Sequence, residues 1–312
     1  MNYLRRNVTH RDSLGCIYQR ELVTGAALGI ILTGSSGPNM TDSRNNDRSH
    51  QPLRVGAVNY LNSKPLIYGF DQIAHDAQLS CDLPSRLADS LACGRLDVAL
   101  IPVFEFFTGD GYQIASDACV ASFGPVQSVK LYFRTKPQDV RTLALDEGSR
   151  TSAALCRVLL AKRFELNPEC EPLPIGDSLG DTKADAVLLI GDRAMQPLED
   201  ESEFADVWDL GEEWRRETGL PFVFAVWALR RGIEAEPISR ALAECRDLGA
   251  QHLSEIAATE APLLGLREDY AEKYLAHLRY RLDPEARLGL ETFRNACESV
   301  GLCQPNTATT TL

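Results

Sequence analysis

The stretch Leu143-Ala144-Leu145-Asp146-Glu147-Gly148-Ser149-Arg150-Thr151-Ser152 indicates how this chain folds. Its first half is apolar and of strand length, and its second half is a turn of small and polar residues. A helix-like apolar pattern follows over 153–161. The stretch therefore predicts a strand, a tight turn and the first turn of a helix.

This turn carries residues suited to an anion. The first N–H groups of a helix have no partner inside it, and the helix dipole adds partial positive charge there. Ser149, Thr151 and Ser152 offer hydroxyl groups, and Arg150 offers a planar fork of N–H groups that matches a carboxylate. We therefore expect these four residues to bind a small anion. The alternative is an ordinary N-cap, in which one hydroxyl binds only its own helix.

The composition is that of a globular protein with room for one large or two medium domains. The chain has 312 residues, of which 44% are hydrophobic and 24% charged, and its formal net charge is −12. A strongly acidic surface disfavours nucleic acid and anionic membranes as main partners. It does not exclude an anionic small ligand, because a cleft can be locally positive on a negative protein.

The cysteines and histidines indicate neither disulfides nor a metal site. The nine cysteines are scattered, and none forms a Cys-x-x-Cys pair. An odd number of cysteines in mostly apolar surroundings is typical of free thiols in a reducing compartment, so we expect a cytoplasmic protein. The five histidines are also scattered, and no His-Glu-x-x-His or other metal spacing occurs.

The first 52 residues differ from the rest and predict a disordered N-terminal extension. They show no coherent periodicity, and residues 34–52 are rich in Gly, Ser, Asn, Asp and Arg. The apolar run Ala26–Leu32 follows several arginines, as in a signal peptide. The run is short, lies near Glu21 and lacks an Ala-x-Ala cleavage site, which disfavours export. It is also too short to span a bilayer.

Beyond residue 52, strand-like and helix-like patterns alternate, which is typical of a parallel-type α/β architecture. The expected strands are Leu53–Val58, Leu79–Leu83, Asp97–Pro102, Ile114–Phe123, Ser128–Arg134, Thr142–Asp146, Glu171–Ile175, Ala186–Ile190 and Pro221–Leu229. Helical patterns begin at Pro84 and Thr151, and the chain reads as helical throughout from Pro237 to Cys297.

Two strand–helix series followed by helices suggest two lobes joined by two crossings, near residues 134–141 and 220–228. We expect lobe I to comprise residues 53–134 and 226–312, and lobe II residues 135–225. Ligands of open α/β sheets bind at the carboxyl ends of the strands. This rule places the turns near residues 59–63, 85, 149–152 and 191–193 around one cleft.

Several segments, taken together and in this order, resemble the chorismate dehydratases of the futalosine route to menaquinone. They are Val55–Leu66 (Val-Gly-Ala-Val-Asn-Tyr-Leu-Asn-Ser-Lys-Pro-Leu), Ser85–Leu91 with Gly94–Pro102, Asp146–Ser152, Leu188–Ala194, and Trp214 with Thr218–Ala225 and Trp227. The resemblance covers about residues 53–229, is weaker in the C-terminal helices and is absent from the first fifty residues. It implies a two-lobed α/β fold similar to type II periplasmic binding proteins, with a central ligand cleft and C-terminal helices.

The resemblance also implies the reaction. A carbon–oxygen lyase of this family eliminates water from chorismate to give 3-[(1-carboxyvinyl)oxy]benzoate, without a metal or an organic cofactor. The task is to hold a dianion and orient its ring hydroxyl, which calls for positioning and charge stabilisation. We expect Asn62 to be the catalytic residue that orients the leaving hydroxyl or the ring, because an amide donates and accepts at once. The alternative for Asn62 is an Asx-turn.

Three further residues complete the predicted substrate site. Ser85, at another helix start, is expected to bind the second carboxylate or the ring hydroxyl, unless it is a simple N-cap. Tyr60 is expected to pack beside the substrate ring, unless it is buried in its own turn. Asp192 follows a strand end and either faces the cleft, pairs with Arg193 or caps the next segment. No histidine lies in these motifs, so a substrate carboxylate that acts as its own base is a hypothesis.

Two other functions stay open. One is a 1,4-dihydroxy-6-naphthoate synthase-like enzyme of the same pathway, whose proton chemistry would call for a histidine in the cleft. The other is a non-catalytic solute-binding protein, which would be exported. We expect a small anionic substrate and neither a nucleic acid nor a membrane partner. The C-terminal helices either cover a lobe or form a homodimer contact, and Phe222, Phe224 and Trp227 are expected to pack in the core or at the hinge.

Overall fold

The computed structural model describes residues 9–11, 17–19, 51–196 and 203–304. The chain divides into two units, residues 1–52 and 53–312. In the first unit, strand β1 (Thr9–Arg11) pairs antiparallel with β2 (Ile17–Gln19). These strands interrupt the extension that we expected to be disordered, and nearly all the rest of that extension lies outside the described residues.

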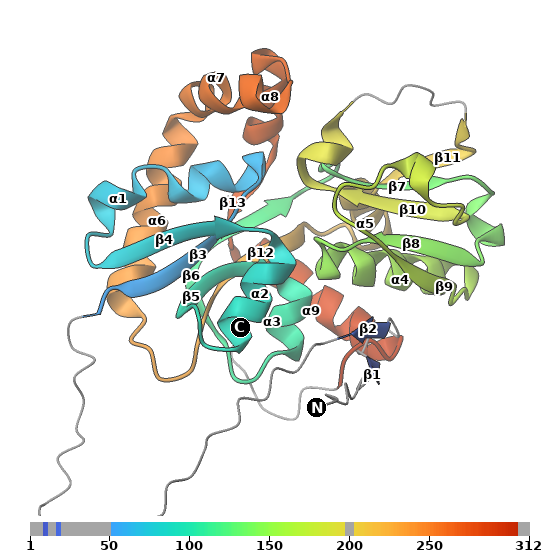
Figure 1. Cartoon of the computed structure of the whole chain (residues 1–312), viewed down its shortest axis with the longest axis horizontal. Helices are drawn as coiled ribbons and strands as arrows, with labels where there is room; N and C mark the ends of the chain where they lie inside the picture. The colour runs from blue at the N-terminus through green and yellow to red at the C-terminus, as the bar shows by residue number, and fades with distance from the viewer. Residues whose placement is uncertain (1–8, 12–16, 20–50, 197–202, 305–312) are drawn as a thin grey trace, which may run out of the picture. The chain divides into compact units, whose positions relative to one another are not determined.

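The second unit contains two β-sheets (Figure 1). The first is six-stranded, in the order β13-β6-β12-β5-β3-β4. Its strands are β3 (Leu53–Val58), β4 (Ala77–Asp82), β5 (Val98–Pro102), β6 (Gln113–Ser122), β12 (Phe222–Leu229) and β13 (Arg279–Arg281). Strands β3, β4 and β5 run parallel, whereas β12 is antiparallel to β5 and β6, and β13 is antiparallel to β6.

The second sheet is five-stranded, in the order β11-β7-β10-β8-β9. Its strands are β7 (Val129–Phe133), β8 (Thr142–Asp146), β9 (Glu169–Leu173), β10 (Ala186–Ile190) and β11 (Asp206–Asp209). Strand β8 is parallel to β9 and β10, whereas β7 is antiparallel to β10 and β11. Both sheets are therefore mixed, with a parallel part built from strand–helix units.

The two sheets define two lobes, and the chain crosses between them twice. We call residues 53–122 and 222–304 lobe I, and residues 129–218 lobe II, because the strands of each range share one sheet. The expected border at residue 134 is wrong, since β7 pairs with β10 and β11 and so belongs to lobe II. The expected return at residue 226 also shifts, since all of β12 lies in lobe I. An apolar strand pattern does not tell which sheet a strand joins.

Helices lie between the strands along the chain, and most of the chain after β12 is helical. They are α1 (Phe70–Ile73), α2 (Pro84–Ala92), α3 (Val103–Thr108), α4 (Arg150–Phe164), α5 (Leu210–Thr218), α6 (Glu236–Gln251), α7 (Leu253–Leu264), α8 (Glu268–His277) and α9 (Pro284–Ser299). Short 3-10 helices are η1 (Leu61–Ile67), η2 (Pro137–Asp139), η3 (Leu179–Asp181) and η4 (Gly191–Met195). Strand β13 interrupts the region expected to be helical throughout, because Tyr280 alternates inward between Arg279 and Arg281.

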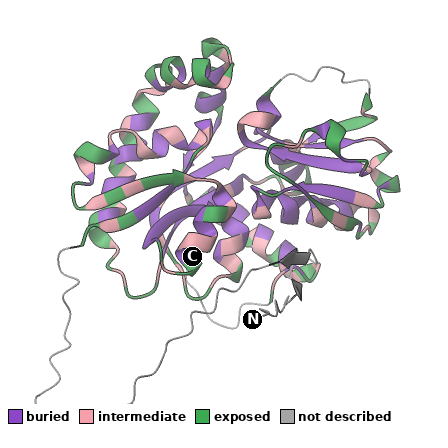
Figure 2. Ribbon diagram, viewed as in Figure 1, coloured by how far each residue is buried: buried purple, intermediate pink, exposed green. Residues whose placement is uncertain are grey.

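Each lobe has its own core. Strands β5 and β10 are buried along their whole length, as expected for apolar strands covered on both faces (Figure 2). Helix α4 buries nine of its fifteen residues and ends at Glu165 in the left-handed conformation. Among the described residues, no helix is long and apolar enough to cross a membrane.

Candidate active site

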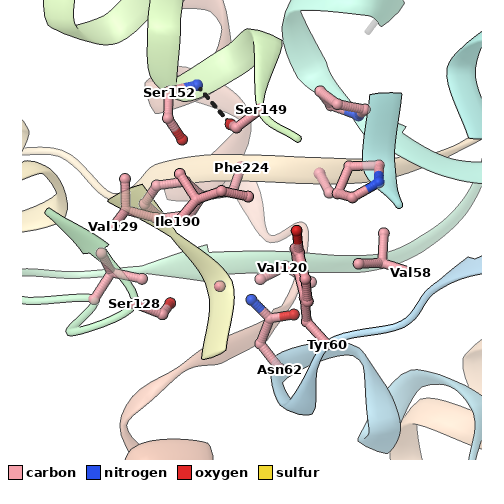
Figure 3. A pocket seen from close by; sticks show the side chains of 15 residues that line it. Val58, Tyr60, Asn62, Val120, Ser128, Val129, Ser149, Ser152, Ile190 and Phe224 are labelled. Atoms are coloured by element: carbon pink, nitrogen blue, oxygen red, sulfur yellow. Dashed lines mark hydrogen bonds between the residues drawn. The ribbon is translucent and has the colours of Figure 1, made fainter. Parts of the chain in front are cut away.

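A small cavity of about 50 Å³ lies between the two lobes (Figure 3). Lobe I contributes Val58, Tyr60, Asn62, Pro84, Pro102, Val120, Phe224 and Ala225, lobe II contributes Val129, Ser149, Ser152, Ile190 and Gly191, and the first crossing contributes Val126 and Ser128. Neutral side chains make up this lining within the described part of the chain. The cavity is an apolar space with a few amide and hydroxyl groups, as is typical of small-molecule sites.

The turn at the start of α4, which is predicted to bind an anion, lines this cavity with Ser149 and Ser152. The N-cap alternative is confirmed for Ser149, because its hydroxyl oxygen caps the helix by accepting from the Ser152 N–H at 3.1 Å. That Ser149 also binds an anion stays a prediction. The hydroxyl hydrogen of Ser149 and the hydroxyl of Ser152 remain to donate into the cavity. A strand, a tight turn and a capped helix were all predicted here, and the structure has all three.

Arg150 and Thr151 are not among the residues that line the cavity, and their side chains make other contacts, which corrects the expectation that this guanidinium and this hydroxyl bind the substrate. The Arg150 guanidinium bridges Asp89 of α2 and Glu105 of α3, at 3.1 Å from a carboxylate oxygen of each. The Thr151 hydroxyl oxygen accepts from the Phe104 N–H at 3.1 Å. Successive residues of a helix point in different directions, so these two side chains face lobe I and hold the lobes together.

Tyr60 and Asn62 reach the cavity from the turn between β3 and η1, as predicted. The Tyr60 ring lies against lobe II: a β-carbon at Gly191 would lie 2.9 Å from the ring, and one at Gly148 would lie 3.0 Å from the hydroxyl oxygen. Burial, with the negative charges of Asp146 and Asp192, raises the pKa of Tyr60 well above its usual range, so the hydroxyl is protonated at neutral pH. Tyr60 is therefore both a cavity residue and an inter-lobe contact.

Asp192 is not among the residues that line the cavity. One of its carboxylate oxygens accepts from the Leu61 N–H of lobe I at 3.2 Å. Burial raises the pKa of Asp192 to about 6. The alternative pairing with Arg193 is wrong, since Arg193 binds Asp146 at 2.5 Å. Asp192 therefore ties the first turn of η1 to lobe II.

Ser85 is not among the cavity residues, which corrects its predicted role. Helix α2 begins at Pro84, and its N-cap position is Leu83, so Ser85 lies one residue inside the helix and is not the N-cap. The neighbouring Pro84 lines the cavity instead. A proline at the first helical position is favourable, and the helix begins at Pro84 as predicted.

Phe224 and Ser128 are among the cavity residues that sequence reasoning missed. Phe224 was expected to pack in the core or at the hinge, but it lines the cavity. The register of β12 against β6 shifts between Val223 and Ala225, and such a bulge redirects a side chain. Ser128 lies in the first crossing, which Asp209 holds by accepting from the N–H groups of Val126 and Gln127 at 2.8 and 2.6 Å. Neither feature leaves a sequence signal.

In the described chain, no group of three or more His, Cys, Asp or Glu side chains is placed to hold a metal ion. The eight described cysteines are free thiols. Three of them, none next to a cavity residue in the chain, lie buried in helices α4, α6 and α9: Cys156, Cys245 and Cys297. The polar groups of the cavity are therefore those of Tyr60, Asn62, Ser128, Ser149 and Ser152.

Two mixed α/β lobes, two crossings and a cavity between them define a protein of the periplasmic-binding-protein-like class. Solved structures of other proteins share this fold. A protein from Archaeoglobus fulgidus superposes with a TM-score of 0.66 at 18% identity, covering 82% of this chain and 99% of that one. The periplasmic aliphatic sulphonate binding protein of Escherichia coli superposes with a TM-score of 0.53 at 14% identity, covering 82% and 90%.

The family follows from sequence. A family model described as menaquinone biosynthesis matches residues 53–299, and the chain belongs to this family. A relative from Thermus thermophilus, named chorismate dehydratase, is 33% identical over 267 residues, which is 79% of this chain and 95% of the relative. The match extends through the C-terminal helices, where the resemblance read from motifs was weaker.

Proposed function

We propose that this chain is a chorismate dehydratase that acts as a carbon–oxygen lyase in menaquinone biosynthesis. It removes the ring hydroxyl of chorismate and a proton from the neighbouring ring carbon as one water, which leaves 3-[(1-carboxyvinyl)oxy]benzoate. The observation that carries the proposal is the shared cavity: Asn62 and Tyr60 of lobe I meet Ser149 and Ser152 of lobe II there, in a chain of this family.

Neutral donors hold the dianion in this proposal. Besides the hydroxyls of Ser149 and Ser152, the N–H groups of Arg150 and Thr151 belong to the first turn of α4 and have no acceptor among the described residues. Backbone N–H groups at a helix start favour a carboxylate, and they gain strength in an apolar, water-poor site. Asn62, on the opposite wall, orients the ring hydroxyl that leaves.

The lobes must separate to admit the substrate. The cavity of about 50 Å³ is small compared with typical small-molecule pockets, which measure about 300–1,000 Å³. Tyr60, Arg150 and Asp192 make inter-lobe contacts that form as the lobes close. Closure around the bound acid then excludes water and favours elimination over the competing rearrangement and loss of enolpyruvate.

The lining favours this reaction over the related synthase reaction. Among the described residues, no histidine lines the cavity, whereas the synthase-like alternative calls for one. The hypothesis that a substrate carboxylate removes the ring proton fits a cavity without a charged side chain. We further propose that the protein works in the cytoplasm, in keeping with its free thiols, and that it requires no cofactor.

The experiment that tests the function is incubation of the purified protein with chorismate, followed by chromatography and mass spectrometry. We expect a benzoate product lighter than chorismate by one water, formed in proportion to enzyme and absent with Asn62→Ala. A protein that binds chorismate and returns it unchanged would support the solute-binding alternative. Products of spontaneous rearrangement alone, equal with and without protein, would contradict the proposal.

A further inference from the structure

Behind the cavity wall, the hydroxyl of Tyr274 connects two residues that line the cavity. Tyr274 lies in α8, is 1% exposed and donates to the Ser128 hydroxyl oxygen at 2.8 Å. Burial raises the pKa of the Tyr274 hydroxyl, and Ser128 and Asn62, its side-chain hydrogen-bond partners, act in the opposite direction. The buried Tyr274 and Ser128 and the half-buried Asn62, which are distant in the sequence, thus form one polar group, the Asn62–Ser128–Tyr274 cluster.

The donor and acceptor in each hydrogen bond of the cluster follow from the hydrogens that its groups can donate. A tyrosine hydroxyl has one hydrogen to donate, and Tyr274 gives it to Ser128. The Tyr274 oxygen must therefore accept from Asn62, whose only donor is the amide nitrogen. Figure 3 agrees, since the Asn62 nitrogen points to the side of Ser128 and the Asn62 oxygen to the side of Tyr60.

The consequence is a defined pattern on the cavity wall. With its nitrogen engaged by Tyr274, Asn62 presents its oxygen to the cavity as an acceptor. Ser128, whose oxygen accepts from Tyr274, keeps its own hydrogen to donate. An acceptor beside a donor suits a ligand that carries both a hydroxyl, which donates, and a carboxylate, which accepts.

We infer that Tyr274 is a positioning residue that sets the direction of the Asn62 amide and holds Ser128 as a donor to the substrate. The inference rests on the proposed function, because chorismate is an acid with a ring hydroxyl. Without the Tyr274 hydroxyl, the Asn62 amide is free to turn by half a rotation and offer its nitrogen instead, which reverses the pattern. Tyr274 acts through Asn62 and touches no substrate itself.

The test compares two conservative variants of buried tyrosines by steady-state kinetics with chorismate. Tyr274→Phe removes the hydroxyl that joins Asn62 and Ser128. Tyr280→Phe is the matched control, since Tyr280 is also buried and its hydroxyl has no partner among the described residues. We expect Tyr274→Phe to lower kcat about tenfold or more with little change in KM, because small misplacements of a reacting group are costly. Tyr280→Phe should stay within about twofold of the wild type. Equal kcat values for both variants would overturn the inference.

A double-mutant cycle separates positioning from general loss of structure. If Tyr274 acts through Asn62, adding Tyr274→Phe to Asn62→Ala causes no further fall in kcat. Losses that multiply in the double variant would mean that Tyr274 acts independently of Asn62. Should Tyr274→Phe not fold, Asn62→Asp replaces the donor nitrogen in a side chain of the same shape. Asn62→Asp is expected to lower kcat to a similar extent, and a wild-type kcat for it would overturn the inference.

The activity of the wild-type enzyme is measured first, so that a failure of the proposed function can be distinguished from a failure of the positioning role of Tyr274. If the wild type forms no benzoate product, the proposed function fails, and the cluster is then judged by thermal unfolding alone. In that case the melting-temperature shifts of Asn62→Ala and Tyr274→Phe should be non-additive, and additive shifts would overturn the cluster. If the wild type is active and Tyr274→Phe is equally active, only the positioning role fails.

Discussion

The aromatic ring of Tyr60 packs directly on Gly191, so that a β-carbon at Gly191 would lie 2.9 Å from the ring carbons. Tyr60 belongs to lobe I and Gly191 to lobe II, and the contact therefore exists only while the lobes are closed. Gly191 also has φ of 66°, a left-handed conformation that glycine adopts without strain. Both features require a residue without a side chain at this point of the cleft.

Gly191→Ala is expected to lower kcat/KM about tenfold or more, because the added methyl group meets the Tyr60 ring and opposes lobe closure. Gly219→Ala is the matched control: its φ is 71°, and a β-carbon there would meet nothing within 4 Å. Both variants should lose about 1 kcal/mol of unfolding free energy from the left-handed backbone. Kinetics and urea denaturation of both proteins check this, and equal activities would contradict a role for the Tyr60 contact.

Substitution of Ser149 should lower the stability of the protein, whereas substitution of Ser152 should lower its activity. The Ser149 hydroxyl caps α4 through the Ser152 N–H, so Ser149→Ala is expected to cost about 1 kcal/mol of unfolding free energy. Ser152→Ala removes no capping bond, and we expect near-native stability with most of the activity lost. Denaturant unfolding and kinetics of the two variants test this pair. A stable, fully active Ser152→Ala would remove this residue from the substrate site.

Arg150→Ala is expected to raise KM several-fold with little change in kcat. The Arg150 guanidinium binds Asp89 and Glu105 of lobe I, so its loss weakens closure and leaves the direct substrate contacts in place. Arg267→Ala, which breaks an exposed ion pair with Asp269, is the control. A loss of kcat/KM above about 100-fold would instead point to direct binding of a substrate carboxylate by Arg150.

The sequence allowed the local elements of the site to be predicted better than its three-dimensional assembly. The strand–turn–helix around Ser149 follows from apolar periodicity and turn chemistry, which are local properties. That Arg150 faces Asp89 and Glu105 depends on which side of α4 meets lobe I, and no local pattern encodes this. The sheet that β7 joins is likewise decided by long-range pairing with β10 and β11.

The same limit explains the residues that were missed. Phe224 enters the cavity because of a register shift in β12, and an alternating or continuous apolar pattern looks the same with or without a bulge. Tyr274 comes from a helix more than two hundred residues after Asn62 in the chain, and its buried hydroxyl meets Ser128 only in the folded protein. The helical pattern predicted over Pro237–Cys297 placed Tyr274 in a helix, which is correct, but it could not reveal the hydrogen bond.

Asp192 should make the stability of the protein depend on pH. Burial raises the pKa of Asp192 from 3.8 to about 6. Because the folded-state pKa is above the unfolded value, the stability that the bound proton contributes is present below pH of about 4 and is lost as the pH rises to about 6. A shift of about two pKa units corresponds to about 3 kcal/mol, as an upper figure.

Asp192→Asn is therefore expected to be more stable than the wild type at pH 7.5 and equally stable near pH 4. The asparagine oxygen can still accept from the Leu61 N–H, so the inter-lobe hydrogen bond is kept. Asp71→Asn, at an exposed site in α1, is the control and should show no such difference. Urea unfolding at three pH values measures the effect, and a destabilised Asp192→Asn at pH 7.5 would contradict it.

The Asp192→Asn variant also tests which group removes the ring proton. Asp192 follows the cavity residue Gly191 in the chain, yet it is not itself among the lining residues, and one of its oxygens accepts from the Leu61 N–H. If a substrate carboxylate is the base, Asp192→Asn keeps at least about a tenth of the wild-type kcat. The pH dependence of kcat should then also be unchanged, since Asp192 carries no proton of the reaction. An Asp192→Asn protein that binds chorismate normally but forms no product would make Asp192 the base and refute substrate assistance.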